Sequence, residues 1–192
     1  MVPAERQLRI VSSKRLFVAI GLPSEVRRTL ADLDPELPGV SWTSAEQMHL
    51  TLGFFGSVPA ETHDRLRQNL SAIRFTPFFL PVSGVGTFPP KGVPKIIWIG
   101  VGTAHPHLFQ VHKRVQEAAL AAGIEPDLRA WHPHFTLARC RRDVSLQSLQ
   151  KFLKRNAELD AGSLRVEEFH LYSTELTPAG SVYTRELTVR HS

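Results

Sequence analysis

The stretch HLTLGFFG, residues 49–56, contains the pattern His-x-Thr-Leu, and HPHFTLARC, residues 132–140, contains it again from His134. One His-x-Thr would carry little information in a chain with nine histidines, but two copies of the longer pattern are an improbable accident. Polar and apolar residues alternate in both copies, as they do along a half-buried β-strand. Residues i and i+2 of a strand share a face, so each histidine should point with its threonine into one space while the leucines point into a layer of helices.

The regions around the two motifs predict a similar order of elements: a strand, a helix, the motif strand and a second helix. In the first half these are a strand over 15–20, a helix over 22–33, the strand that contains His49 and a helix over 59–73. In the second half they are strand-forming stretches over 78–88 and 95–101, a helix over 106–122, the strand that begins at His134 and a helix over 143–156. A terminal hairpin is expected from 164–176 and 181–189. The order indicates an internal duplication.

Two such motif strands would bring together groups that suit chemistry at phosphorus. If the strands lie near each other at a pseudo-twofold axis, two imidazoles and two hydroxyls converge on a cleft that fits a tetrahedral anion. Thr51 and Thr136 can hold phosphoryl oxygens, while one histidine takes a proton from the attacking oxygen and the other gives one to the leaving oxygen. Histidine suits both tasks because its unperturbed pKa is about 6.5. We therefore predict an acid–base site on His49 and His134 that requires no metal and no cofactor.

A cationic side chain follows the second motif. Arg139 lies five residues after His134 and can add positive charge to the cleft. An odd offset would place the two side chains on opposite faces of a regular strand. A strand end or a twist must therefore direct Arg139 into the cleft.

Composition narrows the class of protein. A chain of 192 residues with 42% hydrophobic content fits one globular domain with a real core. The excess of Lys and Arg over Asp and Glu gives a net charge of +5, which favours polyanionic partners. No apolar run reaches the roughly 18 residues that span a bilayer, so we expect a cytoplasmic protein without a membrane partner. The one cysteine, Cys140, is expected to be a small packing residue.

Metal and nucleotide motifs give little support to other chemistries. His132 and His134 form a His-x-His pair that can bind zinc from one strand face, but a third ligand with diagnostic spacing is lacking. The sequence also lacks a Walker loop and a Gly-x-Gly-x-x-Gly fingerprint, which argues against a nucleoside-triphosphate or dinucleotide enzyme.

Several segments together resemble one known family. They are RLFVAI near the start, HLTLGFFG, IIWIGV, HPHFTLARC and the late GSVYTREL. They resemble the RNA 2′,3′-cyclic phosphodiesterases, also called 2′-5′ RNA ligases, of the two-histidine phosphoesterase superfamily. The resemblance runs from Arg15 to Val189, and both motifs match without substitution.

The resemblance implies a fold and a reaction. The fold is α+β, with two pseudo-symmetric lobes that each carry an antiparallel sheet with helices on its outer face and that enclose a central cleft. Residues 1–14 fall outside the resemblance and are expected to be an N-terminal tail without fixed structure, and residues 15–192 would form a single bilobal domain. The reaction is hydrolysis of an RNA-terminal 2′,3′-cyclic phosphate to a 2′-phosphomonoester, with reversible joining of RNA ends through a 2′-5′ bond. RNA ends, tRNA fragments among them, are the expected partners of a monomeric protein.

The family's residue roles carry over to matching positions. His49 would donate a proton to the departing 3′ oxygen, and His134 would be the base that activates water. The resemblance also implies a set of substrate-binding residues: Thr51, Thr136, Arg139, Phe17 and Tyr183. Phe17 alternates with core residues, so buried packing is an equal alternative for it.

Three other readings stay open on the sequence. One is a non-catalytic RNA-binding module, because RLFVAI also looks like the short apolar motif of an RNA-recognition domain, although the companion basic-aromatic motif is absent. Another enzyme of the same superfamily would share both motifs and act on a different cyclic or 2′-5′-linked nucleotide. A metal-dependent phosphohydrolase would use His132 and His134.

Overall fold

A computed structural model describes residues 13–127, 129–178 and 180–192. Eight strands form one sheet with the order β10-β9-β1-β3-β7-β6-β5, and β2 also pairs with β7. All these strand pairs are antiparallel. Their bounds are β1 (Ser13–Gly21), β2 (Val40–Trp42), β3 (His49–Pro59), β5 (Val85–Phe88), β6 (Ile96–Gly100), β7 (His134–Cys140), β9 (Glu168–Thr177) and β10 (Gly180–Arg190). A separate pair joins β4 (Phe78–Ser83) to β8 (Asp160–Val166).

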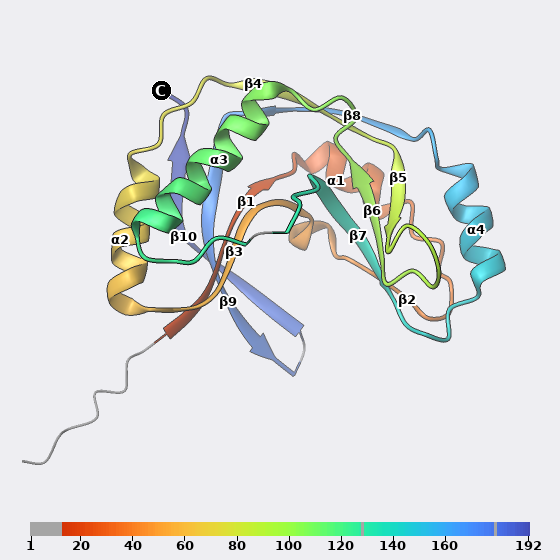
Figure 1. Cartoon of the computed structure of the whole chain (residues 1–192). Coiled ribbons are helices and arrows are strands. Elements are labelled where there is room, and N and C mark those ends of the chain that lie inside the picture. The colour runs from red at the N-terminus through yellow and green to blue at the C-terminus, as the bar shows by residue number, and fades with distance from the viewer. Residues whose placement is uncertain (1–12, 128, 179) are drawn as a thin grey trace, which may run out of the picture.

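The large sheet consists of two halves that meet at the two motif strands (Figure 1). Pairing between β3 and β7 is confined to Leu50 and Phe135. On one side of this junction, β3 pairs along its whole length with β1. On the other side, β7 pairs with β6 and, at its end, with β2. The predicted two-lobed α+β architecture is confirmed, and the two halves share one sheet through a narrow seam.

Each half of the sheet carries a pair of helices (Figure 1). The helices are α1 (Ser24–Ala31), α2 (Ala60–Ser71), α3 (Pro106–Ala121) and α4 (Leu146–Arg155), and a short 3-10 helix spans Ala45–Gln47. The half with β3 is covered by α2 and α3, which are linked by the Asn69 side chain donating to the Ala118 carbonyl. The half with β7 lies beside α1 and α4. There the Trp42 indole donates to the Leu30 carbonyl of α1 and packs against the Phe152 ring of α4. None of the helices in the described ranges is long and apolar enough to cross a bilayer.

The apolar residues of the two motifs orient these strands. Leu50, Leu52, Phe135 and Leu137 are all fully buried in the core. Burying one such side chain is worth about 1.5–3 kcal/mol, so turning either strand over would be very costly. The histidines and threonines that alternate with them are therefore held on the opposite face of the sheet.

Three strand boundaries differ from those that the sequence predicts. The stretch 78–88 is two strands rather than one, because Gly84 has a positive φ of 78° and redirects the chain from β8 to β6. The stretch 164–176 is also divided: its first residues belong to β8, and the rest form β9 against β1 and β10. Strand β1 starts at Ser13, so residues 13 and 14 of the predicted tail are part of the sheet, and residues 1–12 lie outside the described residues.

Candidate active site

His49 is the first residue of β3 and is held at its inner ring nitrogen. Its Nδ1 donates to the carbonyl of Gln47 at 2.7 Å. Because a carbonyl can only accept a hydrogen bond, the proton of the neutral ring lies on Nδ1. The other ring nitrogen, Nε2, is therefore available for proton transfer. The ring packs against Phe17 at 4.9 Å between centroids and meets Tyr183 edge-on at 5.6 Å.

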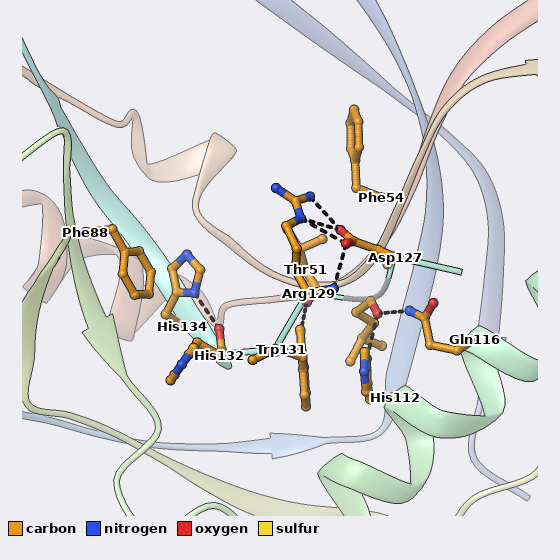
Figure 2. A pocket seen from close by; sticks show the side chains of 13 residues that line it. Thr51, Phe54, Phe88, His112, Gln116, Asp127, Arg129, Trp131, His132 and His134 are labelled. Carbon is orange, nitrogen blue, oxygen red and sulfur yellow. Dashed lines mark hydrogen bonds and ion pairs between the residues drawn. The ribbon is translucent and has the colours of Figure 1, made fainter. Parts of the chain in front are cut away.

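His134 is held in the same way at the start of β7. Its Nδ1 donates to the carbonyl of His132 at 2.6 Å, which again leaves Nε2 without a tether (Figure 2). Its ring contacts Phe88 at 5.1 Å and Trp98 at 6.3 Å between centroids. Each motif histidine thus has the same backbone anchor, two residues upstream, and an aromatic wall from its own half of the sheet.

The strand register brings the two motifs face to face. Leu50 and Phe135 are paired across the antiparallel seam. In this register His49 lies across from Thr136, and Thr51 lies across from His134, all on the face away from the core. The outer neighbours of the two motif strands are related in the same way, because Gly21 of β1 pairs with His49 and Gly100 of β6 pairs with His134. The two imidazoles and two hydroxyls therefore border one cleft.

Burial sets the proton affinity of both rings. It lowers the pKa of His49, the hydrogen bond to the Gln47 carbonyl partly offsets this effect, and repulsion from His134 lowers the pKa further. Burial also lowers the pKa of His134, again against the effect of its backbone hydrogen bond, and His132 adds a repulsive contribution. Mutual repulsion disfavours a doubly protonated pair, so one ring can be an acid while the other is a base.

A β-bulge follows the threonine in both motif strands. On β3, Thr51 pairs with Ala19 and Gly53 with Val18, so Leu52 is the extra residue. On β7, Thr136 pairs with Trp98 and Ala138 with Ile97, so Leu137 is extra. A bulge shifts the alternation by one residue. The residue five positions after each histidine consequently shares the face of that histidine, and this residue is Phe54 in one motif and Arg139 in the other.

The bulge on β3 leaves carbonyl groups that side chains satisfy. The Leu52 carbonyl accepts from His112 Nδ1 at 2.8 Å and from Gln116 Nε2 at 2.9 Å, both on α3 (Figure 2). The Thr51 carbonyl accepts from the Trp131 indole at 3.0 Å. On β7 the matching Leu137 carbonyl accepts from the backbone N–H of Thr43 at 2.7 Å. These bonds fix both motif strands where they bend.

Comparison with known proteins places this geometry in a family. The sequence profile described as LigT like Phosphoesterase matches residues 20–98 and again residues 99–183. The chain belongs to this family. The two successive matches agree with the duplication that the motifs predict, and the boundary between them falls between Trp98 and Ile99, inside β6.

Relatives of the chain carry one activity in their names. The RNA 2′,3′-cyclic phosphodiesterase of Archaeoglobus fulgidus is 32% identical, and the match covers 88% of this chain and 96% of the relative. The protein of the same name from Escherichia coli is also 32% identical, with 89% and 93% covered.

Solved structures share the fold of this chain over nearly its whole length. E. coli LigT complexed with 3′-AMP matches with a TM-score of 0.78 at 27% identity over 94% of this chain and 99% of that one. TT0787 of Thermus thermophilus matches with a TM-score of 0.75 at 27% identity over 92% and 97%.

In this member of the LigT-like family, most of the predicted site residues line the cleft face. Thr51 and Thr136 are half-buried beside the opposite histidines, and Tyr183 is half-buried on β10. Arg139 is exposed and pairs with Ile96, which shares the face of Trp98. Phe17 is only 4% exposed, so its ring serves to pack His49 and offers little surface to a ligand.

The remaining predicted ligands and the cysteine lie as follows. His132 is exposed next to His134, and the residues that the structure describes contain no group of three His, Cys, Asp or Glu side chains arranged to hold a metal ion. Cys140 is half-buried at the end of β7, and burial raises the pKa of its thiol.

Three aromatic residues of the site were not predicted. Trp98 alternates with the buried Ile97 and Ile99, and this alternation alone would have placed it on the cleft face. Its indole lies across Gly86, where a Cβ would come within 2.3 Å of the ring. Phe88 and Tyr172 have no comparable signal, because their contacts with His134 and Phe17 depend on which strands pair.

Proposed function

We propose that the chain hydrolyses RNA-terminal 2′,3′-cyclic phosphates to 2′-phosphomonoesters without a metal, and that the same site reversibly joins RNA ends through a 2′-5′ bond, with a 5′-hydroxyl in the place of water. In hydrolysis, His134 Nε2 takes a proton from water as the water oxygen attacks phosphorus. His49, protonated on both ring nitrogens before this step, gives its Nε2 proton to the 3′ oxygen as the bond between that oxygen and phosphorus breaks. The product keeps the phosphate on the 2′ oxygen.

The remaining cleft residues stabilise charge and position the nucleotide. The hydroxyls of Thr51 and Thr136 donate to the non-bridging oxygens, where negative charge builds up in the transition state. The guanidinium of Arg139 adds a positive charge that the bulge directs to this face. Tyr183 lies near the nucleotide, and Phe17 maintains the ring of His49 in place.

The observation that carries the proposal is the matched tethering of the two histidines. Both rings donate from Nδ1 to a backbone carbonyl, at 2.7 Å and 2.6 Å, so both keep Nε2 for proton transfer. Ordinary surface histidines on two strands would have no reason to share this arrangement. In-line displacement at phosphorus needs an acid and a base on opposite sides, which a pseudo-twofold pair provides. The names of the relatives, and the complexes of E. coli LigT with 3′-AMP and with phosphate, support the same substrate class.

The test is to identify the product made from a short RNA that ends in a 2′,3′-cyclic phosphate, in buffer with EDTA. Phosphorus NMR distinguishes a 2′-phosphate from a 3′-phosphate and from the cyclic ester. The matched control is the same RNA with a 3′-phosphate end, which should not react. We expect a 2′-phosphate at the same rate with and without EDTA.

Other products would contradict parts of the proposal. A 3′-phosphate would mean that the 2′ oxygen leaves, and the assignment of acid and base to the substrate oxygens would be wrong. Activity abolished by EDTA and restored by zinc would support the metal-dependent alternative at His132 and His134. No turnover by folded protein would overturn the proposed substrate class.

A further inference from the structure

A cavity of about 340 Å³ adjoins one end of the reactive cleft (Figure 2). Its lining includes His134 and Thr51 on the two motif strands, together with Phe54, Asp127, Arg129 and Trp131. Neither His49 nor the aromatic residues that pack on it are among the described residues that line this space. The cavity thus opens on the His134 side of the cleft.

The direction of the proposed reaction determines what this side must receive. In an in-line displacement the attacking oxygen and the leaving oxygen lie on opposite sides of phosphorus. His49 serves the leaving 3′ oxygen, so the nucleoside that bears the cyclic phosphate extends toward His49. Whatever is attached to the attacking oxygen extends past His134, into the cavity.

Water alone does not account for the size of this space. A water molecule occupies about 30 Å³, whereas small-molecule sites range over roughly 300–1,000 Å³. The cavity, at about 340 Å³, falls in the second class. A group much larger than water therefore fits on the nucleophile side.

The cavity offers groups that recognise a nucleoside. Phe54 follows the bulge of β3, and 52% of its surface is exposed, which leaves a flat ring for stacking. The Arg15 guanidinium lies 5.8 Å from the centre of this ring. Arg129 and Asp127 form an ion pair near Phe54, and exposed donors and acceptors of this kind can bind ribose hydroxyls (Figure 2).

The duplication makes Phe54 informative. It stands at the position that Arg139 occupies in the second motif, five residues after the histidine, and both residues follow the same bulge. One end of the pseudo-symmetric cleft therefore carries a cation, and the other carries an exposed phenyl ring. Such a difference suits two unlike occupants on the two sides of phosphorus.

We propose that this cavity is the acceptor subsite, which binds the first nucleoside of an RNA strand with a 5′-hydroxyl and stacks its base on Phe54. This inference rests on the proposed function of the cleft. In joining, the 5′ oxygen gives its proton to His134 and forms the bond to phosphorus. The bond to the 3′ oxygen breaks, that oxygen takes a proton from His49, and a 2′-5′ diester with a free 3′-hydroxyl results. In the reverse reaction the cavity holds the nucleoside that leaves.

Two substrates separate this subsite from the rest of the cleft. Hydrolysis of a mononucleoside 2′,3′-cyclic phosphate leaves the cavity empty, whereas cleavage of a 2′-5′-linked dinucleoside monophosphate to cyclic phosphate and nucleoside fills it. We expect Phe54→Ala to lower kcat/KM for the dinucleotide about tenfold or more, as the loss of a stacked base does elsewhere. Hydrolysis of the cyclic mononucleotide should stay within about twofold, and Phe54→Trp should restore dinucleotide cleavage. Phe79→Ala, which removes an exposed ring on β4, is the matched control.

Each other result is decisive. Equal losses on both substrates, or no loss on either, would overturn the role of Phe54 and the subsite with it. A parent protein that hydrolyses the cyclic mononucleotide but neither cleaves nor forms a 2′-5′ bond would overturn the acceptor subsite and leave the proposed hydrolysis intact. A parent protein that acts on neither substrate would overturn the proposed function itself.

Discussion

Substitution of either motif histidine by asparagine separates proton transfer from folding. The amide nitrogen of asparagine occupies nearly the place of Nδ1 and can donate to the same carbonyl, which lies 2.7 Å from His49 and 2.6 Å from His134. It has no group at the place of Nε2. His49→Asn and His134→Asn should therefore keep the backbone anchor and lose the acid or the base.

The expected losses follow from these contacts. A well-placed acid or base contributes about 10²–10⁴ in rate, which is about 2.7–5.4 kcal/mol of transition-state stabilisation for each histidine. The retained hydrogen bond preserves about 0.5–1.5 kcal/mol of stability. What His49→Asn loses in the folded state are its ring contacts with Phe17 at 4.9 Å and with Tyr183 at 5.6 Å, each worth about 0.5–1.5 kcal/mol. The double variant should be little slower than the slower single variant, because residues that act as a unit are not additive.

The assay is kcat/KM on a mononucleoside 2′,3′-cyclic phosphate in EDTA, with urea unfolding of each variant. His191→Asn, at an exposed histidine near the C-terminus, is the matched control and should behave as the parent. A folded His49→Asn or His134→Asn protein whose kcat/KM stays within about tenfold of the parent would refute the two-histidine mechanism. A variant that fails to fold would refute the equivalence of the asparagine amide and Nδ1.

Three further predictions concern pH and the seam. Because burial lowers the pKa of both His49 and His134, the profile of kcat/KM against pH should be bell-shaped with its maximum below about 6.5, and a maximum above pH 7 would contradict the assignment. The free energy of unfolding should fall in acid, because histidines whose pKa is lowered in the folded state bind fewer protons there than in the unfolded chain below pH ~6.5. These residues are His49, His63, His112, His134 and His170. Each can lower the free energy of unfolding by up to about 1.4 kcal/mol per pH unit, and urea unfolding at pH 7.5 and 5.5 measures the sum. Leu50→Ala, at the fully buried seam, should cost about 2–5 kcal/mol of unfolding free energy, and a cost below 1 kcal/mol would show that the seam does not need it.

Local pattern was enough to locate most of the regular structure. Helices predicted over 59–73 and 106–122 are observed as α2 and α3, because apolar residues at helical spacing have few other ways to bury a stripe. The failures lie at 78–88 and 164–176, where apolar residues continue through a change of pairing partner. Periodicity reports that a segment is extended, but it does not report which strand it pairs with.

The candidate site divides in a similar way. The alternation in the two motifs placed each histidine with its threonine on one face, and the buried leucines show why that face is opposite the core. The position of Arg139 was the open question, since a regular strand would turn it inward. The answer is the bulge at Leu137, which depends on how β7 registers against β6 and is not visible in β7 alone.

The sequence by itself determined which groups the candidate site contains and their local geometry: two histidines and two threonines, on strands whose buried apolar residues place them on the opposite face, toward solvent. Tertiary structure alone decided that β3 and β7 meet at Leu50 and Phe135, that Phe17, Tyr183, Phe88 and Trp98 wall the two rings, and that a cavity opens beside His134. The physical reason is the distance along the sequence between the residues that interact. Side-chain alternation is set between neighbours along the chain, whereas strand order, register and cavities arise from contacts between residues far apart in the sequence, whose partners no local pattern specifies.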